Sequence, residues 1–530
     1  MFDRKIMSTM RYIFSLSLAI ICILAQAQLK QRKLGTPLNN PSFNYWAPFV
    51  SLDGNTLLFT SDYTEDGLPA TFLSVRQGVD WKEPFLVPKK VTALSYTKAF
   101  TLSHDGKIIY ITSSRGGTQG GYDIWVSQFS GNTFSEVLSI GAPVNSPLNE
   151  ASPSLSPDGN TLFFMRCKKM SNTGADECKI MMAKKNQYGL WDTVTELPEI
   201  INAGNSQMPR MLADGQTLLF SSNRHQPNKG GMDFYISRFA DNRWGTPINL
   251  DFANTLSDDV YASASSVGFY LLKDAPGAKR SELVEFQFPP EIKPKAVVRV
   301  AGLVEGLTDP SKANVNLIIP ETKTILFTIR PDAKGNFVCY IPEGNLYDLY
   351  VDPPMENFRY FSKRYDLTGK KLPNSDRITA TLKPLASGDE MELSTVSFKK
   401  HSSGLDPISK VELQKIARMM RGNPSLNYTV DVSLYGLMKD SIQSEDLTEV
   451  ISDTVIYEME VQIDSVTTEM RDSIAVEYTY HNDRTQQQAE AIASHLIGLG
   501  VAENKITITY MALEEPVADN RRTVIKLKAR

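Results

Sequence analysis

The amino-acid sequence predicts a multidomain, mainly β protein, in which a β-propeller is followed by a small β-sandwich and a C-terminal α/β domain. Its 530 residues are more than one hydrophobic core organises. A motif with an Asp-Gly turn recurs in the first half of the chain with a period of about fifty residues, which indicates a propeller or a solenoid. Helical periodicity begins only beyond Glu390.

The composition is that of a globular protein without a basic excess. Hydrophobic residues make up 42% of the chain and charged residues 22%, and the formal net charge is -4. A partner with many phosphates would require a surplus of lysine and arginine. The balance of charge therefore argues against nucleic acid as a partner.

The first 27 residues have the pattern of a secretory signal peptide. An apolar run from Ile13 to Leu24 follows a positively charged start, and Ala25-Gln26-Ala27 forms a small-residue cleavage site. The apolar run is too short to span a bilayer. We expect a mature chain that begins at Gln28, is exported, and has no transmembrane helix.

Four cysteines fall in different settings. Cys22 lies in the signal peptide, and because Ile20 and Ile21 precede it, lipid attachment is the less favoured alternative. Cys167 and Cys178 flank a ten-residue loop between two apolar runs, so we expect a cross-strand disulfide, with two free thiols as the alternative. Cys339 lies inside an apolar run and is expected to be a buried thiol.

The repeat consists of an Asp-Gly turn followed by an apolar strand. Its four copies read LDGNTLLFTS, SHDGKIIYITS, SPDGNTLFFM and ADGQTLLFSS, and their aspartates are Asp53, Asp105, Asp158 and Asp214. Glycine accepts a positive φ and aspartate caps its own backbone, so the turn is tight. A degenerate fifth copy starts at Ser266.

Each repeat continues with two further strand signals. One reads GYDIWVSQ or GMDFYISR, and the next is marked by an aromatic residue, at Trp81, Phe134, Trp191 and Trp244. Four short strands in each unit are typical of a propeller blade. The fifth copy lacks its aromatic strand, whereas residues 31–40 (QRKLGTPLNN) resemble residues 139–150. We therefore expect five blades, the last closed by the N-terminal strand, with six blades as the alternative.

The SPDG and GYDIW pattern resembles the TolB-like propeller repeats of bacterial periplasmic proteins, also described as PD40 or WD40-like repeats. The resemblance covers residues 31–290 and defines a propeller domain of residues 28–290. It implies a fold rather than an activity, because such propellers bind proteins or accompany peptidases. Asp123 and Asp233 could suggest a metal site, but carboxylates that accept hydrogen bonds from turn amides are the favoured interpretation.

A Pro/Lys linker from Phe288 to Lys295 is expected before residues 296–386, where alternating strands predict a small antiparallel β-sandwich. Its run PDAKGNFVCYIPEGNLYDLYV resembles the carboxypeptidase regulatory-like domain. The matching residues are Asp332, Gly335, Phe337, Pro342, Gly344 and Tyr347. That family normally has no catalytic residues and acts as a spacer or docking module.

Residues 390–530 read strand, helix, strand, helix, strand, strand. The first predicted helix has one apolar face, formed by Leu413, Ile416, Ala417 and Met420. The second begins with a predicted capping box of Thr485 and Gln488. Its apolar face consists of Ala489, Ile492, Ala493, Leu496 and Leu499. This order, with the ending NRRTVIKL, resembles the OmpA-like C-terminal domain.

The OmpA-like family grips the diaminopimelate of peptidoglycan with one aspartate and one arginine, which pair with its ammonium and carboxylate groups. In this sequence Leu437 occupies the position of the aspartate and Gln488 that of the arginine. The resemblance therefore implies that the usual grip is lost or weakened. Replacement charges could come from nearby polar residues, namely Asp483, Arg484, Asn520 and Arg521, although Asp483 and Arg484 are expected to be solvated.

An insertion at residues 438–480 separates the two family motifs. It contains eleven acidic residues against Lys439 and Arg471, and its alternating pattern predicts an added β-hairpin beside the family's ligand groove. Its negative charge disfavours peptidoglycan, which is rich in carboxylates.

No catalytic motif is present in the sequence: G-x-S-x-G, H-E-x-x-H and C-x-x-C are all missing. We expect no enzyme activity, no cofactor and no metal. The domain order resembles envelope proteins of gliding, protein-secreting Gram-negative bacteria, some linked to type IX secretion. This implies a periplasmic, outer-membrane-associated scaffold that binds envelope proteins; the alternative is a peptidoglycan tether with a non-standard site.

Overall fold

The structure is a computed structural model, and it describes residues 31–93, 95–130, 133–265, 269–369, 373–444, 447–514 and 521–530. The predicted signal peptide (residues 1–27) and Asn520 lie outside these residues. The chain forms two compact units, one mainly of residues up to Val300 and one mainly of residues from Ala301 to Arg530. No described helix is long and apolar enough to cross a membrane.

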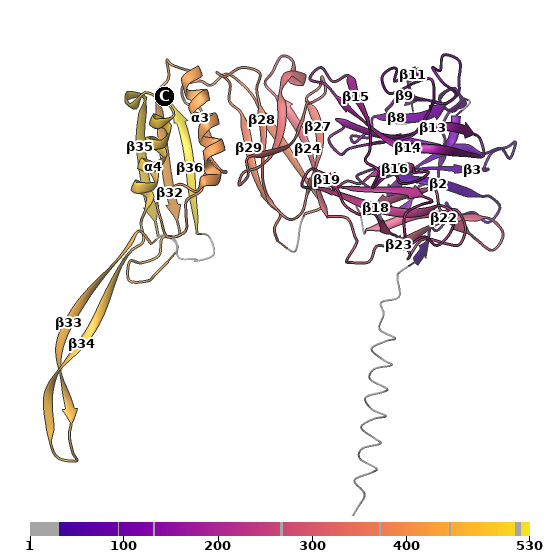
Figure 1. Cartoon of the computed structure of the whole chain (residues 1–530). Helices are drawn as coiled ribbons and strands as arrows, with labels where there is room; N and C mark the ends of the chain where they lie inside the picture. Colours follow the sequence, from indigo (N-terminus) through magenta and orange to yellow (C-terminus); the bar gives the residue numbers. More distant parts are fainter. Residues whose placement is uncertain are drawn as a thin grey trace, which may run out of the picture. The chain divides into compact units, whose positions relative to one another are not determined.

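The first unit consists of five separate antiparallel sheets in the described residues (Figure 1). We number them one to five along the chain. Sheet one contains β2 (Tyr45–Val50), β3 (Thr56–Ser61), β4 (Ala70–Gln77), β5 (Asp80–Trp81) and β6 (Phe85–Leu86); sheet two contains β7 (Ser95–Leu102), β8 (Ile108–Ser113), β9 (Asp123–Ser130), β10 (Thr133–Phe134) and β11 (Leu138–Ser139). A single helical turn, α2 (Lys89–Thr92), joins them.

The remaining three sheets repeat this plan. Sheet three contains β12 (Asn149–Leu155), β13 (Thr161–Ser171), β14 (Gly174–Lys185) and β15 (Trp191–Glu196); sheet four contains β16 (Gln207–Met211), β17 (Thr217–Ser222), β18 (Asp233–Ala240), β19 (Arg243–Trp244) and β20 (Ile248–Asn249). Sheet five contains β21 (Ala262–Ser265), β22 (Tyr270–Pro276), β23 (Ser281–Gln287) and, from the other end of the unit, β1 (Gln31–Lys33).

The first strands of the sheets contact one another in sequence: β2 contacts β7, β7 contacts β12, and β12 contacts β16. A hydrophobic cluster joins sheets four and five through Leu219, Phe234 and Leu271, and β2 contacts β21. The contacts therefore run in a closed ring, which is the arrangement of a β-propeller. The prediction of a mainly β protein with a propeller fold is confirmed.

The Asp-Gly turns lie where the sequence predicts them, between the first and second strands of a sheet. In the third sheet the Oδ1 atom of Asp158 accepts a hydrogen bond of 3.1 Å from the amide of Asn160, and Gly159 has a φ of 70°. The aromatic markers Trp81, Phe134, Trp191 and Trp244 lie in β5, β10, β15 and β19, which are the outermost strands of their sheets. Local sequence signals therefore mark both edges of the first four sheets.

Strand β1 completes the fifth sheet by antiparallel pairing with β23, with Gln31 opposite Phe286 and Lys33 opposite Val284. Ion pairs reinforce this pairing, because Arg32 lies 2.6 Å from Glu285 and Lys33 lies 2.6 Å from Glu282. This is the closure by the N-terminal strand that the sequence predicts, and it covers a sheet edge that would otherwise be open.

The segment from Phe288 to Lys295 is not the free linker that its composition suggests. Phe288 is buried and its ring packs against Phe252, with 5.5 Å between the ring centroids. The guanidinium of Arg238 donates to the carbonyl of Lys293 (2.9 Å). An apolar residue at the start of the segment therefore holds it against sheets four and five.

Residues 297–381 form two antiparallel sheets, as expected for a sandwich. Their orders are β27-β24-β30 and β26-β25-β28-β29. The strands are β24 (Val297–Glu305), β25 (Asn314–Ile319), β26 (Thr324–Ile329), β27 (Asn336–Pro342), β28 (Leu346–Asp352), β29 (Phe361–Asp366) and β30 (Ser375–Thr381), with a 3-10 turn at Pro310–Lys312. Cys339 is free and buried, as predicted.

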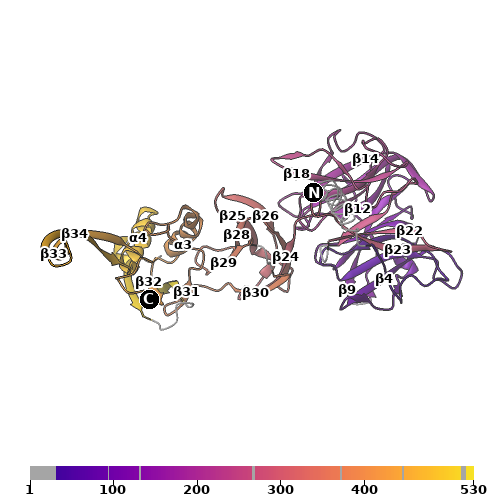
Figure 2. The same cartoon turned by 90° about the horizontal axis from the view of Figure 1, so that it is seen from below.

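The C-terminal part has a four-stranded sheet in the order β31-β36-β32-β35, with β32 parallel to β35. Its strands are β31 (Glu390–Glu392), β32 (Tyr428–Tyr435), β35 (Ile506–Leu513) and β36 (Arg522–Ala529). Helices α3 (Lys410–Gly422) and α4 (Thr485–Gly498) contact each other and lie on the same side of this sheet (Figure 2). Short 3-10 turns occupy Pro407–Ser409 and Glu503–Lys505.

The sandwich and the α/β part share one hydrophobic core, so the predicted boundary at residues 386–390 does not separate two cores. Ile318, Tyr350 and Tyr360 from the sandwich belong to the same cluster as Leu413 and Ile492 from the helices. The hydroxyl of Tyr360 donates to the buried Glu412 carboxylate of α3 (2.6 Å). Residues on both sides of the boundary are therefore needed to bury the apolar face of α3.

The start of α4 differs from the predicted capping box. The Oδ1 atom of Asp483 accepts hydrogen bonds from the amide (2.9 Å) and the hydroxyl (2.8 Å) of Thr485. Thr485 is therefore the first helical residue, not the cap, and the N-cap position belongs to Arg484, whose side chain forms no capping hydrogen bond. The Asp483 carboxylate lies near the positive end of the helix. The predicted apolar faces of both helices are otherwise confirmed.

The insertion forms the predicted hairpin. Its strands are β33 (Glu449–Gln462) and β34 (Thr468–His481), and the two pair with each other along their whole length. None of the residues in either strand is buried.

Candidate functional site

The first strands of four sheets share a bend near their start. Register shifts interrupt the pairing of β2, β7, β12 and β16 with their neighbours. In three of them the bend has a residue with positive φ followed by proline, namely Ala47 (48°), Ser152 (51°) and Met208 (50°). Proline offers no amide hydrogen to a ladder, so it suits a bulge.

A pocket of about 730 Å³ lies beside these bends and is lined by residues from all five sheets or the loops beside them. Because the first strands of the sheets form the ring of contacts, a pocket that touches every sheet lies on the axis of the propeller. We call it the axial pocket. Its lining includes Trp46, Tyr96, Lys98, Gly174, Ala175, Asn205, Gln207, Asn223, Asp258, Asp259, Tyr261, Lys273 and Asp274.

One wall of the axial pocket contains a buried ion pair. The ammonium group of Lys273 pairs with the carboxylate of Asp259, and it also donates to the carbonyl of Ala253 (3.0 Å). Sheet three has the equivalent pair, in which Arg166 lies 2.7 Å from the buried Glu150. In both sheets the pair joins the start of the first strand, or a residue shortly before it, to the second strand.

The other polar groups of the axial pocket do not form buried ion pairs of this kind. The ammonium group of Lys98 lies 5.1 Å from the centroid of the Tyr261 ring, as in a cation–π pair. The hydroxyls of Tyr261 and Tyr96 are 2.7 Å apart, and burial raises the pKa of both phenols, so both are neutral at physiological pH. Burial also raises the pKa of the Asp274 carboxyl, which accepts from the Ala47 amide (3.2 Å).

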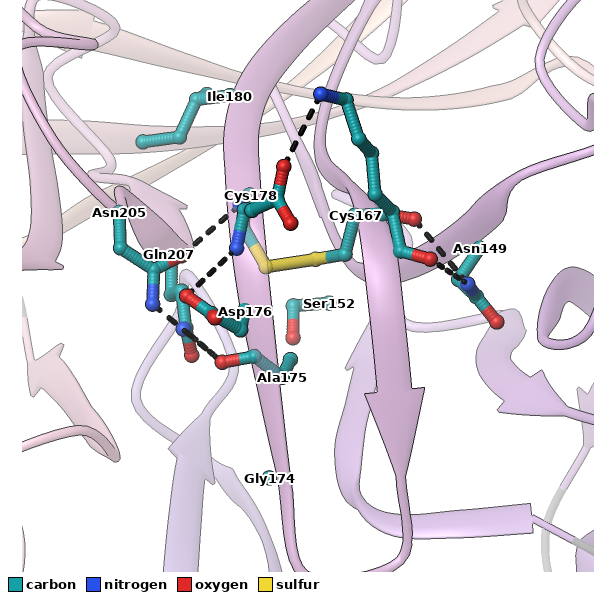
Figure 3. Close-up of a disulfide and its surroundings, with 12 residues drawn as sticks. Asn149, Ser152, Cys167, Gly174, Ala175, Asp176, Cys178, Ile180, Asn205 and Gln207 are labelled. Atoms are coloured by element: carbon teal, nitrogen blue, oxygen red, sulfur yellow. Dashed lines mark hydrogen bonds and ion pairs between the residues drawn. A yellow bond between two sulfur atoms is a disulfide. The ribbon is translucent and has the colours of Figure 1, made fainter.

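The disulfide holds a second wall of the axial pocket. Cys167 and Cys178 are directly opposite each other in β13 and β14, with an S–S distance of 2.04 Å (Figure 3). Beyond them the hairpin continues to a tip whose residues Gly174 and Ala175 line the pocket. The Ala175 carbonyl accepts from Gln207 Nε2 (2.8 Å), as Figure 3 shows, so sheet four holds the hairpin in place.

The axial pocket can therefore bind a polar or amphipathic ligand. Aromatic rings (Trp46, Tyr96 and Tyr261) offer apolar contact surfaces, and one cation lies against them. Amide side chains and a carboxylate provide hydrogen bonds in both directions. The neutral phenols cannot act as bases.

The residues at the OmpA-family positions form a different environment from the one that the family motif implies. Gln488 is buried, with 4% of its surface exposed, and Leu437 is half-buried with its amide bonded to the carbonyl of Leu513 (3.0 Å). Both positions carry uncharged side chains. The charge pair that grips diaminopimelate in the family has no counterpart at these two positions.

Arg484 is not the solvated residue that its sequence position suggests. Its side chain is 7% exposed, and its guanidinium donates to the carbonyl of Ser402. The loop that contains Ser402 also contains His401, whose Nδ1 lies 3.1 Å from the Ser444 carbonyl at the base of the insertion. Arg484 therefore supports a packed loop, which sequence periodicity does not reveal.

The other sequence candidates have separate positions. Asp483 is exposed and accepts from the amide of Thr485, the first residue of α4, and Arg521 precedes β36 with its backbone against Gly436. Asp123 and Asp233 behave as the favoured interpretation predicts: Asp123 accepts from the amide of Gln119 (2.8 Å) and Asp233 from that of Lys229 (2.6 Å).

Sequence reasoning missed the axial pocket. Its signals are the residue-proline pairs in three first strands and the charged Lys273 inside the apolar run YLLKDAP. Neither identifies a pocket by itself, because the lining comes together only when five repeats form a ring.

The comparisons with known proteins found solved structures of similar repeated β-sheets. A protein described as TolB from Agrobacterium tumefaciens is 17% identical, with a TM-score of 0.29, covering 56% of this chain and 90% of that one. An endo-arabinase from Bacteroides thetaiotaomicron is 14% identical, with a TM-score of 0.34, covering 47% and 96%. Trypanosoma rangeli sialidase is 14% identical, with a TM-score of 0.30, covering 47% and 46%.

No family model and no curated protein matches the chain. The identities and TM-scores of the structural matches are too low to transfer an activity, a substrate or a partner.

Proposed function

We propose that this chain is an exported, non-enzymatic scaffold of the bacterial envelope, periplasmic and associated with the outer membrane, that holds a segment of a protein partner in the axial pocket. The observation that carries the proposal is the composition of this pocket. All five sheets contribute to its lining, and a disulfide-bonded hairpin forms one of its walls.

The remaining domains fit a scaffold. We interpret the first unit as a five-bladed propeller closed by its N-terminal strand, the sandwich as carboxypeptidase regulatory-like, and the α/β part as a divergent OmpA-like domain. In this interpretation the last two are spacer and docking modules. The Asp-Gly turns, the turn at Asp332 and Gly335, and the helix and strand order of residues 390–530 support it.

The peptidoglycan tether has less support. The guanidinium of Arg484 is directed to the Ser402 carbonyl, and Gln488 is buried without a charge. A carboxylate ligand would have to displace the loop around Ser402 to reach Arg484. A link to type IX secretion or gliding machinery rests on domain order alone and belongs to the same proposal.

The test uses the mature chain, residues 28–530, immobilised and exposed to solubilised envelope proteins of its host. Lys98→Glu reverses the charge of one lysine that lines the axial pocket, and Lys184→Glu makes the same change at an exposed position of β14. We expect the native chain and the Lys184→Glu variant to capture at least one protein in similar amounts. The Lys98→Glu variant should capture at least fivefold less of that protein. If the native chain and both variants captured the same proteins in the same amounts, the axial pocket would not be the binding site and this part of the proposal would be wrong.

A second arm addresses the tether. Sedimentation with purified, diaminopimelate-containing peptidoglycan compares the native mature chain with the Leu437→Asp/Gln488→Arg double variant. The whole chain is required because residues on both sides of residue 386 share one core. The scaffold predicts that the native chain stays in solution, whereas sedimentation of the native chain would establish the tether.

A further inference from the structure

The hairpin of β33 and β34, which we call the ribbon, is an unusual element for a protein in aqueous solution. Each strand has 14 residues, and within the described part of the chain neither has a second strand beside it. A two-stranded ribbon alone is at best marginally stable in water, and each outer edge presents unpaired amide and carbonyl groups.

Both faces of the ribbon expose large apolar side chains. Cross-strand neighbours lie on the same face, so Ile456 and Ile474 share one face, and both are more than 60% exposed. The other face carries Tyr457 and Met459, exposed by 47% and 44%. Surface hydrophobic residues at this density indicate an interaction surface.

The charges of the ribbon point to the kind of partner. Between Glu449 and His481 there are eight carboxylates and one arginine, Arg471. Two carboxylate pairs lie directly opposite each other across the strands, Asp453 with Glu477 and Glu458 with Asp472. Like charges in directly opposed positions destabilise a sheet, and here no cation lies in register with either pair. A cationic neighbour would relieve both pairs.

The spacing of these pairs is specific. Asp453 and Glu458 are five residues apart on β33, and Asp472 and Glu477 are five residues apart on β34 (458 - 453 = 477 - 472 = 5). Because side chains alternate between faces, an odd separation places the two pairs on opposite faces of the ribbon. A strand added at either edge would meet them with the same spacing.

We propose that the ribbon is a docking arm that accepts an extended, basic segment of a partner protein as a third β-strand. The segment pairs with one outer edge through its backbone, continues the apolar rows with its own apolar side chains, and places Lys or Arg residues about five positions apart beside the two carboxylate pairs. This mode is β-strand addition, in which the backbone supplies affinity and alternate side chains supply specificity. A second copy of the ribbon does not fit, because its charge is of the same sign.

The experiment uses the full mature chain and synthetic 14-residue peptides of alternating Val and Thr as probes. The first peptide carries two Lys residues five positions apart, the second has them four apart, and the third carries two Glu residues five apart. Fluorescence anisotropy measures each Kd. We expect the first peptide to bind at least tenfold tighter than the second and the third not to bind.

A charge-reversed chain provides the decisive variant. Asp453→Lys/Glu477→Lys changes exposed residues only, so it leaves the folded units intact, and Asp192→Lys/Glu196→Lys makes the same change on the exposed strand β15. We expect the first variant to bind the basic peptide with a Kd at least tenfold higher than that of the native chain. The second variant should bind it with the same Kd as the native chain.

Three further outcomes would overturn the proposal. Binding without new hydrogen-exchange protection in residues 449–481 would show a purely electrostatic contact and not an added strand. Dimerisation of the native chain that is abolished by deleting residues 449–481 would show that a second copy covers the ribbon. Equal affinity for all three peptides would also contradict the inference.

Discussion

At the scale of single residues, the buried Lys273–Asp259 pair shows how a charged group becomes part of the structure. Both side chains are 4% exposed, so the ammonium and carboxylate groups depend on each other for charge compensation. The pair Arg166–Glu150 in sheet three repeats the arrangement, so two of the five sheets carry it. Loss of one partner leaves the other buried and unpaired.

We therefore expect Asp259→Asn to destabilise the first unit by about 3–5 kcal/mol, because a buried ammonium group would remain without its counter-charge. Denaturant unfolding followed by the fluorescence of the tryptophans, all of which lie in this unit, measures the effect. Asp251→Asn is the control, since the carboxylate of Asp251 is exposed and pairs with an exposed lysine, Lys229. Equal midpoints for the two variants would contradict the prediction.

The three cysteines of the mature chain should differ in reactivity. Cys339 is fully buried, and burial raises the pKa of its thiol to about 12, so almost no thiolate exists at pH 8. We expect iodoacetamide to label no cysteine in the native chain, Cys339 alone after denaturation, and all three after denaturation with reduction. Mass spectrometry of tryptic peptides counts the labels, and labelling of Cys167 without reduction would contradict the disulfide.

Replacing both disulfide cysteines by serine should cost about 2–3 kcal/mol, as expected for a short closed loop, because the half-cystines are 11 positions apart in sequence. The change should also loosen the tip of the β13–β14 hairpin. Limited proteolysis near residues 171–175 checks this consequence. Tyr188→Ala, an exposed change on the loop that follows β14, is the control and should leave both stability and cleavage unchanged.

At the scale of elements, α3 illustrates why the sandwich and the α/β part fold together. Its Glu412 is buried and accepts hydrogen bonds from Tyr360 (2.6 Å) and Ser362 (3.0 Å), both from the sandwich. Burial raises the pKa of the Glu412 carboxyl above its ordinary value of 4.5. The protonated form is thus favoured in the folded state.

The sign of the pH effect follows from that direction. A carboxyl whose pKa is raised on folding contributes stability that is fully present below about pH 4.5 and is lost as the pH rises through the folded pKa. We expect Glu412→Gln to remove this loss, so the variant gains stability relative to the native chain as the pH rises. Thermal unfolding of the second unit between pH 4 and 8 measures the difference in stability between the variant and the native chain. Glu356→Gln is the control, because Glu356 is exposed and pairs with Arg418, and it should leave the pH profile unchanged.

Local signals in the sequence predicted much of the elements and little of their assembly. The Asp-Gly turns and the aromatic residues of the outermost strands depend on residues within about ten positions in sequence. The edges of the sheets could therefore be predicted. The axial pocket could not, because Lys98, Gln207 and Tyr261 meet only through contacts between distant repeats. The burial of Arg484 was missed for a similar reason, since it depends on a loop 82 residues away in sequence.

At the scale of the whole molecule, the outer edge of the fifth sheet is covered by a strand of three residues. Strand β1 supplies the last sheet with its outer strand through Gln31, Arg32 and Lys33. We expect deletion of residues 28–36 to leave the edge of β23 open and to cause concentration-dependent aggregation, measured by light scattering. An Arg32→Gln/Lys33→Gln variant keeps the backbone pairing and should remain monodisperse; aggregation of this variant to the same extent would assign the effect to charge and not to closure.

The closing strand also sets the order of events during synthesis. Ribosomes deliver the chain from the N-terminus, and β1 is among the first residues after the predicted signal peptide, yet its partner Glu285 follows 253 residues later. Until β23 has emerged, β1 lacks the strand with which it pairs in the folded unit. The nascent protein must therefore remain soluble during the long interval before β23 is available to pair with its earliest strand. A chaperone that prevents aggregation of this protein would act during that interval.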